Sequence, residues 1–226
     1  MVVSARVRRG SGTTGDNLTA TFTETYLAET RRIIEAIDAS AVERLAAGLA
    51  GVRERSGRLF ILGVGGSAGH ASHAVNDFRK LCGIEAYTPV DNASELTARI
   101  NDDGWESSFS AWLQVSRLGS RDGLLVFSVG GGDRQRGISA NIVTALDAAR
   151  AAGCFIGGIV GRDGGHTLAV GEAVVVIPPL VEARVAPHTE GLCAVIWHLL
   201  VSHPELQRSA TKWESSVAEK ARSVAS

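Results

Sequence analysis

The sequence predicts a three-layer α/β fold, in which helices cover both faces of a five-stranded parallel sheet. Short runs that are apolar throughout alternate with stretches of helical periodicity, as expected for parallel strands that are buried on both faces. Two of these runs lead into turns rich in glycine and serine, at residues 63–67 and 128–139. A chain of 226 residues is long enough for one such domain with a helical extension.

Two amphipathic helices are expected before the first strand. Between residues 17 and 37 the apolar side chains recur mostly three, four or seven positions apart. Ser40, with Glu43 three residues later, is typical of a helix start, and this second helix is expected to end near Ser56 and Gly57. The apolar stripes of both helices need a cover, and a helix bundle shared between subunits is one solution.

The remaining elements are expected to alternate along the chain. Five apolar runs predict strands at 58–64, 85–90, 123–130, 154–161 and 173–179. Helices are expected at 68–81, 91–100, 139–153 and 189–203. The predicted divisions of the chain are a disordered lead-in (1–16), the helical pair (17–56), the α/β domain (57–204) and a polar, helical tail (205–226).

Composition argues against several classes of partner. A formal net charge of −1 provides no basic surface for nucleic acid or an anionic membrane, and no apolar run reaches the roughly 18 residues of a membrane span. Cys82, Cys154 and Cys193 are far apart among apolar residues, as expected for core residues in a reducing cytoplasm. The first glycine-rich turn has neither the dinucleotide-binding spacing nor a P-loop lysine, so no nucleotide cofactor is expected.

Both glycine-rich turns are expected at the carboxyl ends of strands, where the following helices point their N-terminal amides at anions. Ser67 in the first turn, and Ser128 and Ser139 in the second, can cap a helix or hydrogen-bond a ligand. Because the two turns should converge on one crevice, they favour a small phosphorylated ligand. Arg134 and Arg136 are candidate clamps for the phosphate or an adjacent subunit, with solvated loop charges as the alternative.

Histidines and carboxylates on two helices are candidate metal ligands. His73 and Asp77 are four residues apart and share a helix face, although a surface ion pair is the alternative. Glu190 and His198 are separated by about 12 Å of helix rise. One ion can therefore reach both only if the side chains lean together or come from different subunits. A hydrogen-bonded core histidine is the alternative for His198.

Other polar residues are weaker candidates. His70 lies one turn before His73, whereas His188 and His203, at the ends of the last helix, are expected to be exposed to solvent. Asn101 and Asp102 are expected in a turn that can hydrogen-bond sugar hydroxyls, although the same residues form ordinary turns.

In this order the segments resemble the sugar isomerase (SIS) domain family, and within it the phosphoheptose isomerases. The resemblance covers about residues 20 to 203 and rests on the motifs GVGGSAGHASHAVND, INDDGWESSF, FSVGGG…SANI and TEGLCAVIWH. It implies a three-layer αβα SIS domain, a homotetramer with the N-terminal helices in a central bundle, and active sites built between subunits. It also implies that sedoheptulose 7-phosphate is converted to a D-glycero-heptose 7-phosphate.

The resemblance assigns roles residue by residue. Asp77, or a metal-held water beside it, becomes the base that moves a proton between C1 and C2, and His198 becomes the acid that shuttles protons on the sugar oxygens. Zn²⁺ that polarises the enediolate is assigned to His73, Asp77, Glu190 and His198. The implied substrate-binding residues are Gly65, Gly66, Ser67, Asn101, Asp102, Ser128, Gly130, Ser139 and Glu190.

The sequence departs from the family pattern at several points. Val64 replaces an asparagine, Asp77 a glutamate and Glu190 a glutamine, and about six residues are inserted before Ser139. The alternatives are therefore an isomerase of another phosphosugar, a non-catalytic SIS-fold binding or regulatory protein, and a purely structural tetramer. The absence of a helix-turn-helix pattern and of a basic patch argues against a DNA-binding regulator.

Overall fold

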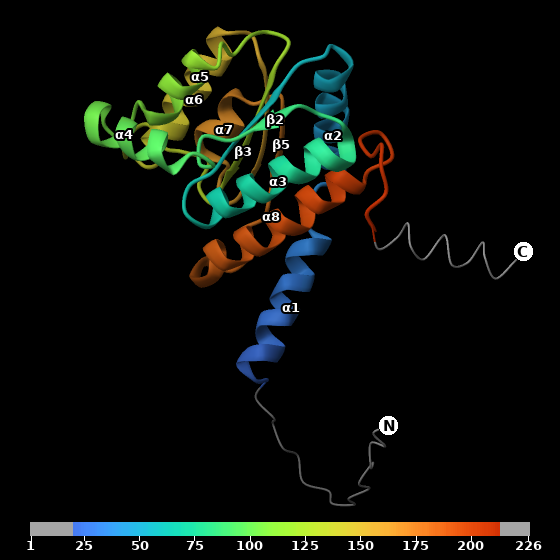
Figure 1. The fold of residues 1–226 in the computed structure, drawn as a ribbon. Helices are drawn as coiled ribbons and strands as arrows, with labels where there is room; N and C mark the ends of the chain where they lie inside the picture. Colours follow the sequence, from blue (N-terminus) through green and yellow to red (C-terminus); the bar gives the residue numbers. More distant parts are fainter. Residues whose placement is uncertain (1–19, 213–226) are drawn as a thin grey trace, which may run out of the picture.

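The computed structural model describes residues 20–212, so the lead-in expected at 1–16 and residues 213–226 of the expected tail lie outside the described residues. The described residues form a five-stranded parallel sheet with helices on both faces (Figure 1). The strands, in the spatial order β2-β1-β3-β4-β5, are β1 (Leu59–Leu62), β2 (Ala86–Tyr87), β3 (Gly123–Ser128), β4 (Phe155–Val160) and β5 (Ala173–Val176). The predicted fold class is confirmed.

Two hydrophobic cores lie on opposite faces of the sheet. One face is covered by α2 (Ala39–Glu54), α3 (Gly66–Cys82) and α8 (Val185–Ser202). The other is covered by α5 (Ser108–Val115) and α6 (Ala140–Ala151), with α4 (Ala93–Asp103) and α7 (Gly165–Val170) beside them. Ile61 points into the first core and Phe60 into the second, which is why the strands are apolar without alternation.

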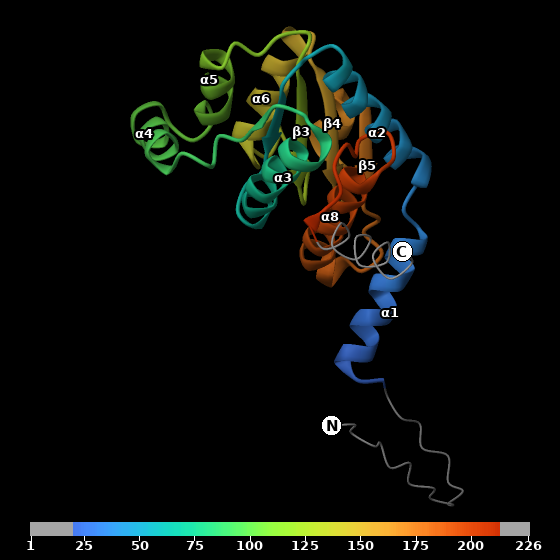
Figure 2. The same cartoon turned by 45° about the vertical axis from the view of Figure 1, so that its right-hand side comes forward.

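The two helices that precede the sheet differ in their environment. α2 packs against β4 and β5, so its apolar stripe is covered within the chain. It begins slightly earlier than expected, because Asp38 and not Ser40 is the capping residue. α1 (Phe22–Glu35) projects from the body and leaves Phe22, Leu27 and Ile34 exposed (Figure 2).

The cysteines are core residues, as expected. Cys82, Cys154 and Cys193 are buried and free. Burial raises the pKa of Cys82 and of Cys154 to about 12 and raises that of Cys193 as well, so all three are neutral thiols near pH 7. Within residues 20–212, no helix is both long and apolar enough to cross a membrane.

Candidate active site

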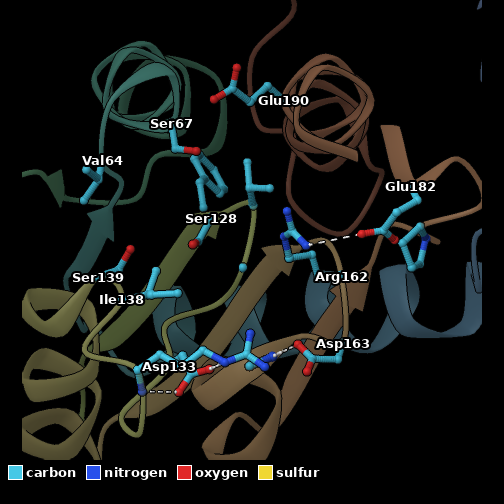
Figure 3. Close-up of a pocket in the computed structure, with 16 residues that line it drawn as sticks. Val64, Ser67, Ser128, Asp133, Ile138, Ser139, Arg162, Asp163, Glu182 and Glu190 are labelled. Carbon is cyan, nitrogen blue, oxygen red and sulfur yellow. Dashed lines mark hydrogen bonds and ion pairs between the residues drawn. The ribbon is translucent and has the colours of Figure 1, made fainter. Parts of the chain in front are cut away.

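A cavity of about 710 Å³ opens at the carboxyl ends of β1, β3 and β4 (Figure 3). Residues from both glycine-rich turns line it, as do residues after β4 and one carboxylate of α8. The predicted residues that line it are Ser67, Ser128, Gly130, Ser139 and Glu190. The two turns therefore converge on one crevice, as the strand order requires.

The first turn brings α3 and α8 close together. Gly65 has a φ of 62°, a left-handed conformation that glycine adopts readily and that lets the chain pass directly from β1 into α3. A Cβ on Gly66 would lie 2.7 Å from Oε1 of Glu190. Glycine at position 66 thus allows the α8 carboxylate to approach the N-terminus of α3, next to the buried Ser67.

The second turn is held by its own backbone. Ser128 is buried at the end of β3, and its Oγ accepts a hydrogen bond of 3.0 Å from the N–H of Gly131. Ser139 precedes α6 with a φ of 51°, and its side chain makes no capping hydrogen bond. Arg162, after β4, has the same φ and also lines the cavity. Left-handed non-glycine residues are costly and cluster at functional sites.

The inserted residues form a small hairpin in which Asp133 and Ile138 exchange backbone hydrogen bonds of 2.9 and 3.0 Å. Arg136 lines the cavity and pairs with Asp133 at 3.5 Å. Arg134 is instead bound by Asp147 of α6 and does not line the cavity. Of the two predicted clamps, only Arg136 is thus placed to meet a ligand there.

A second group of side chains lies farther along α3 and α8. His73, Asp77 and His198 can each offer one ligand atom, and these atoms lie within 4.8 Å of one another. Nδ1 of His198 donates to the carbonyl oxygen of Ala194 at 2.7 Å, so the lone pair of Nε2 remains available. Two imidazoles and one carboxylate suit a divalent metal such as Zn²⁺ and leave a coordination position for substrate.

Glu190 is not a member of this three-residue group. α3 and α8 run in the same direction. Gly66, at the start of α3, lies beside Glu190 near the start of α8. Farther along both helices, the ring centres of His73 and His198 lie 5.5 Å apart. Within one chain Glu190 therefore faces the cavity, about two helical turns before His198.

Asn101 and Asp102 lie elsewhere in the fold. The turn expected at these residues is wrong: α4 continues to Asp103 and ends at Gly104, which has a φ of 86°. Both side chains are exposed, and Asn101 donates to Asp102 at 2.8 Å. Neither lines the cavity, and α4 is on the face of the sheet opposite to α3 and α8 (Figure 1).

Four of the histidines singled out in the sequence differ in their exposure. The expected exposure of His188 is wrong, because α1 covers the ring and leaves it 3% exposed. His203 is partly buried, and its Nε2 lies 3.1 Å from Oε2 of Glu43, so its expected exposure is also wrong. His198 is exposed, which argues against the core alternative. His70 is not a member of the three-residue group.

Comparison with known proteins identifies the family. No family model matches the chain. The phosphoheptose isomerase of Paramagnetospirillum magneticum is 30% identical over 180 residues, which cover 76% of this chain and 78% of the relative. This chain belongs to the phosphoheptose isomerase family. The phosphoheptose isomerase of Trichlorobacter lovleyi is 36% identical over 148 residues, covering 63% of this chain and 70% of that protein.

A solved phosphoheptose isomerase also shares the fold. The protein from Neisseria gonorrhoeae superposes with a TM-score of 0.69 at 22% identity, covering 80% of this chain and 96% of that chain.

Sequence reasoning missed three cavity residues of this phosphoheptose isomerase homologue. Arg162, Asp163 and Glu182 line the cavity beside the predicted serines (Figure 3). The first two stand directly after the apolar run 154–161, at the end of a third strand. The rule that ligands bind at strand ends could have identified them. Glu182 follows a stretch without regular structure, so no sequence pattern places it there.

Proposed function

We propose that this chain isomerises sedoheptulose 7-phosphate to a D-glycero-heptose 7-phosphate. The observation that carries the proposal is that α3 and α8 join two different sites: the cavity at their N-terminal ends and the His73, Asp77 and His198 group farther along. The first suits a phosphate and the second suits the carbonyl end of a sugar. The relatives are phosphoheptose isomerases, which supports a phosphorylated seven-carbon sugar as the substrate.

The separation of the two sites suits a long sugar. Six residues of α3 separate Ser67 from His73, a rise of about 9 Å. An extended chain spans about 3.3–3.6 Å per three bonds, so the eight bonds from C1 to phosphorus in an extended heptose 7-phosphate span about 9–10 Å. The four bonds of a triose phosphate span only about 5 Å. A seven-carbon substrate is therefore long enough to reach from the Ser67 end of α3 to His73, whereas a triose phosphate is not.

In this proposal the cavity holds the phosphate. The donors available to an anion there are the N-terminal amides of α6, the hydroxyls of Ser67, Ser128 and Ser139, and the guanidinium groups of Arg136 and Arg162. Four carboxylates also line the cavity, at Asp133, Asp163, Glu182 and Glu190. These acids would repel a free anion, so the correctly placed donors matter for both affinity and orientation.

At the other end, Asp77 removes a proton from C1 of the ketose and returns it to C2, while His198 moves the hydroxyl proton from O1 to O2. His73 and Asp77 would hold a divalent metal, for which we propose Zn²⁺, and His198 would be its third ligand only when the ring is not transferring a proton. The metal would polarise the substrate oxygens and stabilise the negative charge that develops on them. Because Nε2 is the one available nitrogen of His198, this ring can ligate a metal or transfer a proton, but not both at once.

The direct test supplies purified, metal-loaded protein with sedoheptulose 7-phosphate and follows the aldose phosphate by NMR. We expect aldose to form, a chelator to stop the reaction, and added Zn²⁺ to restore it. Metal analysis of the His198→Ala variant separates the two roles of that ring, since metal is lost only if the ring is a ligand. Folded, metal-loaded protein that leaves the ketose unchanged would refute the proposal.

A second substrate is favoured by one feature of the cavity. Val64 and Ile138 place apolar surface beside Ser128 and Ser139, and the inserted hairpin adds Arg136 (Figure 3). An isomerase of another phosphosugar would use this surface to select a substrate with fewer hydroxyls near the phosphate. A panel of ketose phosphates of different length and substitution would rank the two possibilities by kcat/KM.

We also propose that the chain forms a homotetramer in the cytoplasm. The exposed apolar side chains of Phe22 and Leu27 on α1, and of Val195 and Leu199 on α8, support an assembly that covers them. The three buried free thiols are compatible with a reducing compartment. Light scattering of the wild type should give four times the monomer mass, and Leu27→Asp should reduce it.

A further inference from the structure

A buried polar cluster joins α1 to the start of α8. The carboxylate of Glu29 accepts two hydrogen bonds from Arg184, at 2.8 Å from Nε and 2.5 Å from Nη2. Nε2 of His188 lies 3.2 Å from the same carboxylate. The ring of His188 stacks on Tyr26 with centroids 4.4 Å apart, and its Nδ1 lies 3.4 Å from Oγ1 of Thr30. Two-point contact with a carboxylate fixes an arginine in orientation as well as position.

Arg184 is also connected through the chain to a residue that lines the cavity. It is the last residue of a short 3₁₀ helix, η1 (Glu182–Arg184). Pro179 and Glu182 line the cavity, and Oε1 of Glu182 lies 4.0 Å from Nη1 of Arg162 (Figure 3). Residues 177–181, between β5 and η1, belong to neither a strand nor a helix. A three-residue 3₁₀ helix has little stability of its own, so the contacts of Arg184 matter for its position.

We propose that Glu29 is a positioning residue for the phosphate cavity. By holding Arg184 it fixes η1, and Glu182 of η1, 4.0 Å from Arg162, then orients the Arg162 guanidinium that donates to the phosphate. The inference rests on the proposed function, because it takes the cavity as the phosphate site. Glu29 itself is on α1 and does not line the cavity, so its effect is indirect.

The expected consequence is a change in substrate affinity without a change in the chemical step. The cluster does not include His73, Asp77 or His198, which lie farther along α3 and α8. Loss of the Glu29 charge should therefore raise KM for the sugar phosphate about fivefold, a size common for residues that act through intermediate contacts, and leave kcat within about twofold.

The test compares Glu29→Gln with Glu35→Gln as the matched control. Glu35 is on the same helix, is exposed and pairs with Arg31. Amide hydrogen exchange of residues 180–184 is measured with and without inorganic phosphate. We expect phosphate to protect these amides in the wild type and the control, but not in Glu29→Gln. Arg184→Lys, which keeps the charge but not the two-point contact, should behave like Glu29→Gln.

The steady-state constants complete the test. A rise in KM at constant kcat in Glu29→Gln and Arg184→Lys, absent from Glu35→Gln, is the expected result. Unchanged amide exchange at residues 180–184, an equal effect in the control, or a fall in kcat at constant KM would overturn the inference. If the wild type has no isomerase activity, the proposed function fails, and the exchange experiment with phosphate still decides this inference.

Discussion

The two histidines of α8 show how one helix can serve two purposes. His188, near its start, is 3% exposed, and both ring nitrogens face side chains, Glu29 and Thr30. His198, near its end, is exposed, and one nitrogen is held by the Ala194 carbonyl while the other remains available. His73 and Asp77 lie beside that available nitrogen.

A histidine can act on a metal or substrate only when one of its ring nitrogens is available. The number of available ring nitrogens therefore indicates a catalytic or metal-binding role better than the presence of a histidine does. A ring whose nitrogens are both occupied in a buried cluster stabilises the packing of α1 on α8. A ring held at Nδ1 by a backbone carbonyl has a fixed tautomer and presents Nε2 to a metal or substrate. The following variants test whether this division is correct.

The largest effect is expected from His198→Ala. Loss of the available nitrogen should lower kcat/KM by about 10²–10⁴ because the ring acts on the substrate or its metal. The melting temperature should change little, since the ring is exposed. The two quantities are measured by the isomerase assay and by thermal unfolding.

His188→Ala provides the contrast. It should lower the free energy of unfolding by about 1–3 kcal/mol, because it leaves buried groups without a partner. If His188→Ala reduced the rate more than His198→Ala did, the division between the two histidines would be wrong.

A similarly large effect is expected at Asp77. Asp77→Asn removes both a base and an anionic ligand, so kcat should fall by about 10²-fold or more. Asp77→Glu keeps the carboxylate and lengthens the side chain by one methylene, so it should retain more activity than Asp77→Asn. Wild-type activity of Asp77→Asn would show that the carboxylate is not involved in the reaction.

Removing a phosphate contact should have a moderate effect. Ser128→Ala should raise KM by about tenfold, the cost of one hydrogen bond to a charged group, and leave kcat nearly unchanged. Calorimetry should show that the affinity of Ser128→Ala for inorganic phosphate falls by a factor similar to the rise in KM. A fall in kcat with constant KM would place Ser128 at the reacting end of the sugar instead.

The smallest effect concerns the cluster around His188 and depends on pH. The hydrogen bond from Arg184 lowers the pKa of Glu29 to about 2 from its ordinary value of 4.5. The resulting stability is present above pH 4.5 and is lost as the pH falls towards 2. The difference in melting temperature between wild type and Glu29→Gln should therefore be constant from pH 7 to 5 and shrink below it. A difference that grows on acidification would contradict this assignment.

The sequence predicts the fold and the cavity because both depend on local pattern and topology. Apolar runs without alternation indicate strands buried on both faces, and the strand-end rule brings Ser128 and Ser139 to the crevice with Ser67. These expectations require no knowledge of which helices touch.

Features that depend on long-range packing were not predictable. Burial of His188 requires α1 to fold across the start of α8, and nothing in the local sequence specifies that contact. The end of α4 was predicted too early because Asn101 and Asp102 favour turns, whereas the helix continues until Gly104. The resemblance assigns Glu190 and His198 to one metal ion, which requires their side chains to lean together or to come from different subunits. Within one chain, Glu190 is not a member of the His73, Asp77 and His198 group.

In the proposed complex, one sugar phosphate spans the cavity and the His73, Asp77 and His198 group. The most direct measurement is a crystal structure of the zinc-loaded protein with sedoheptulose 7-phosphate, with anomalous data at the zinc edge. We predict a zinc peak bonded to those three side chains and the phosphate beside Ser128 and Ser139. A zinc peak elsewhere, or a phosphate outside the cavity, would contradict the claim.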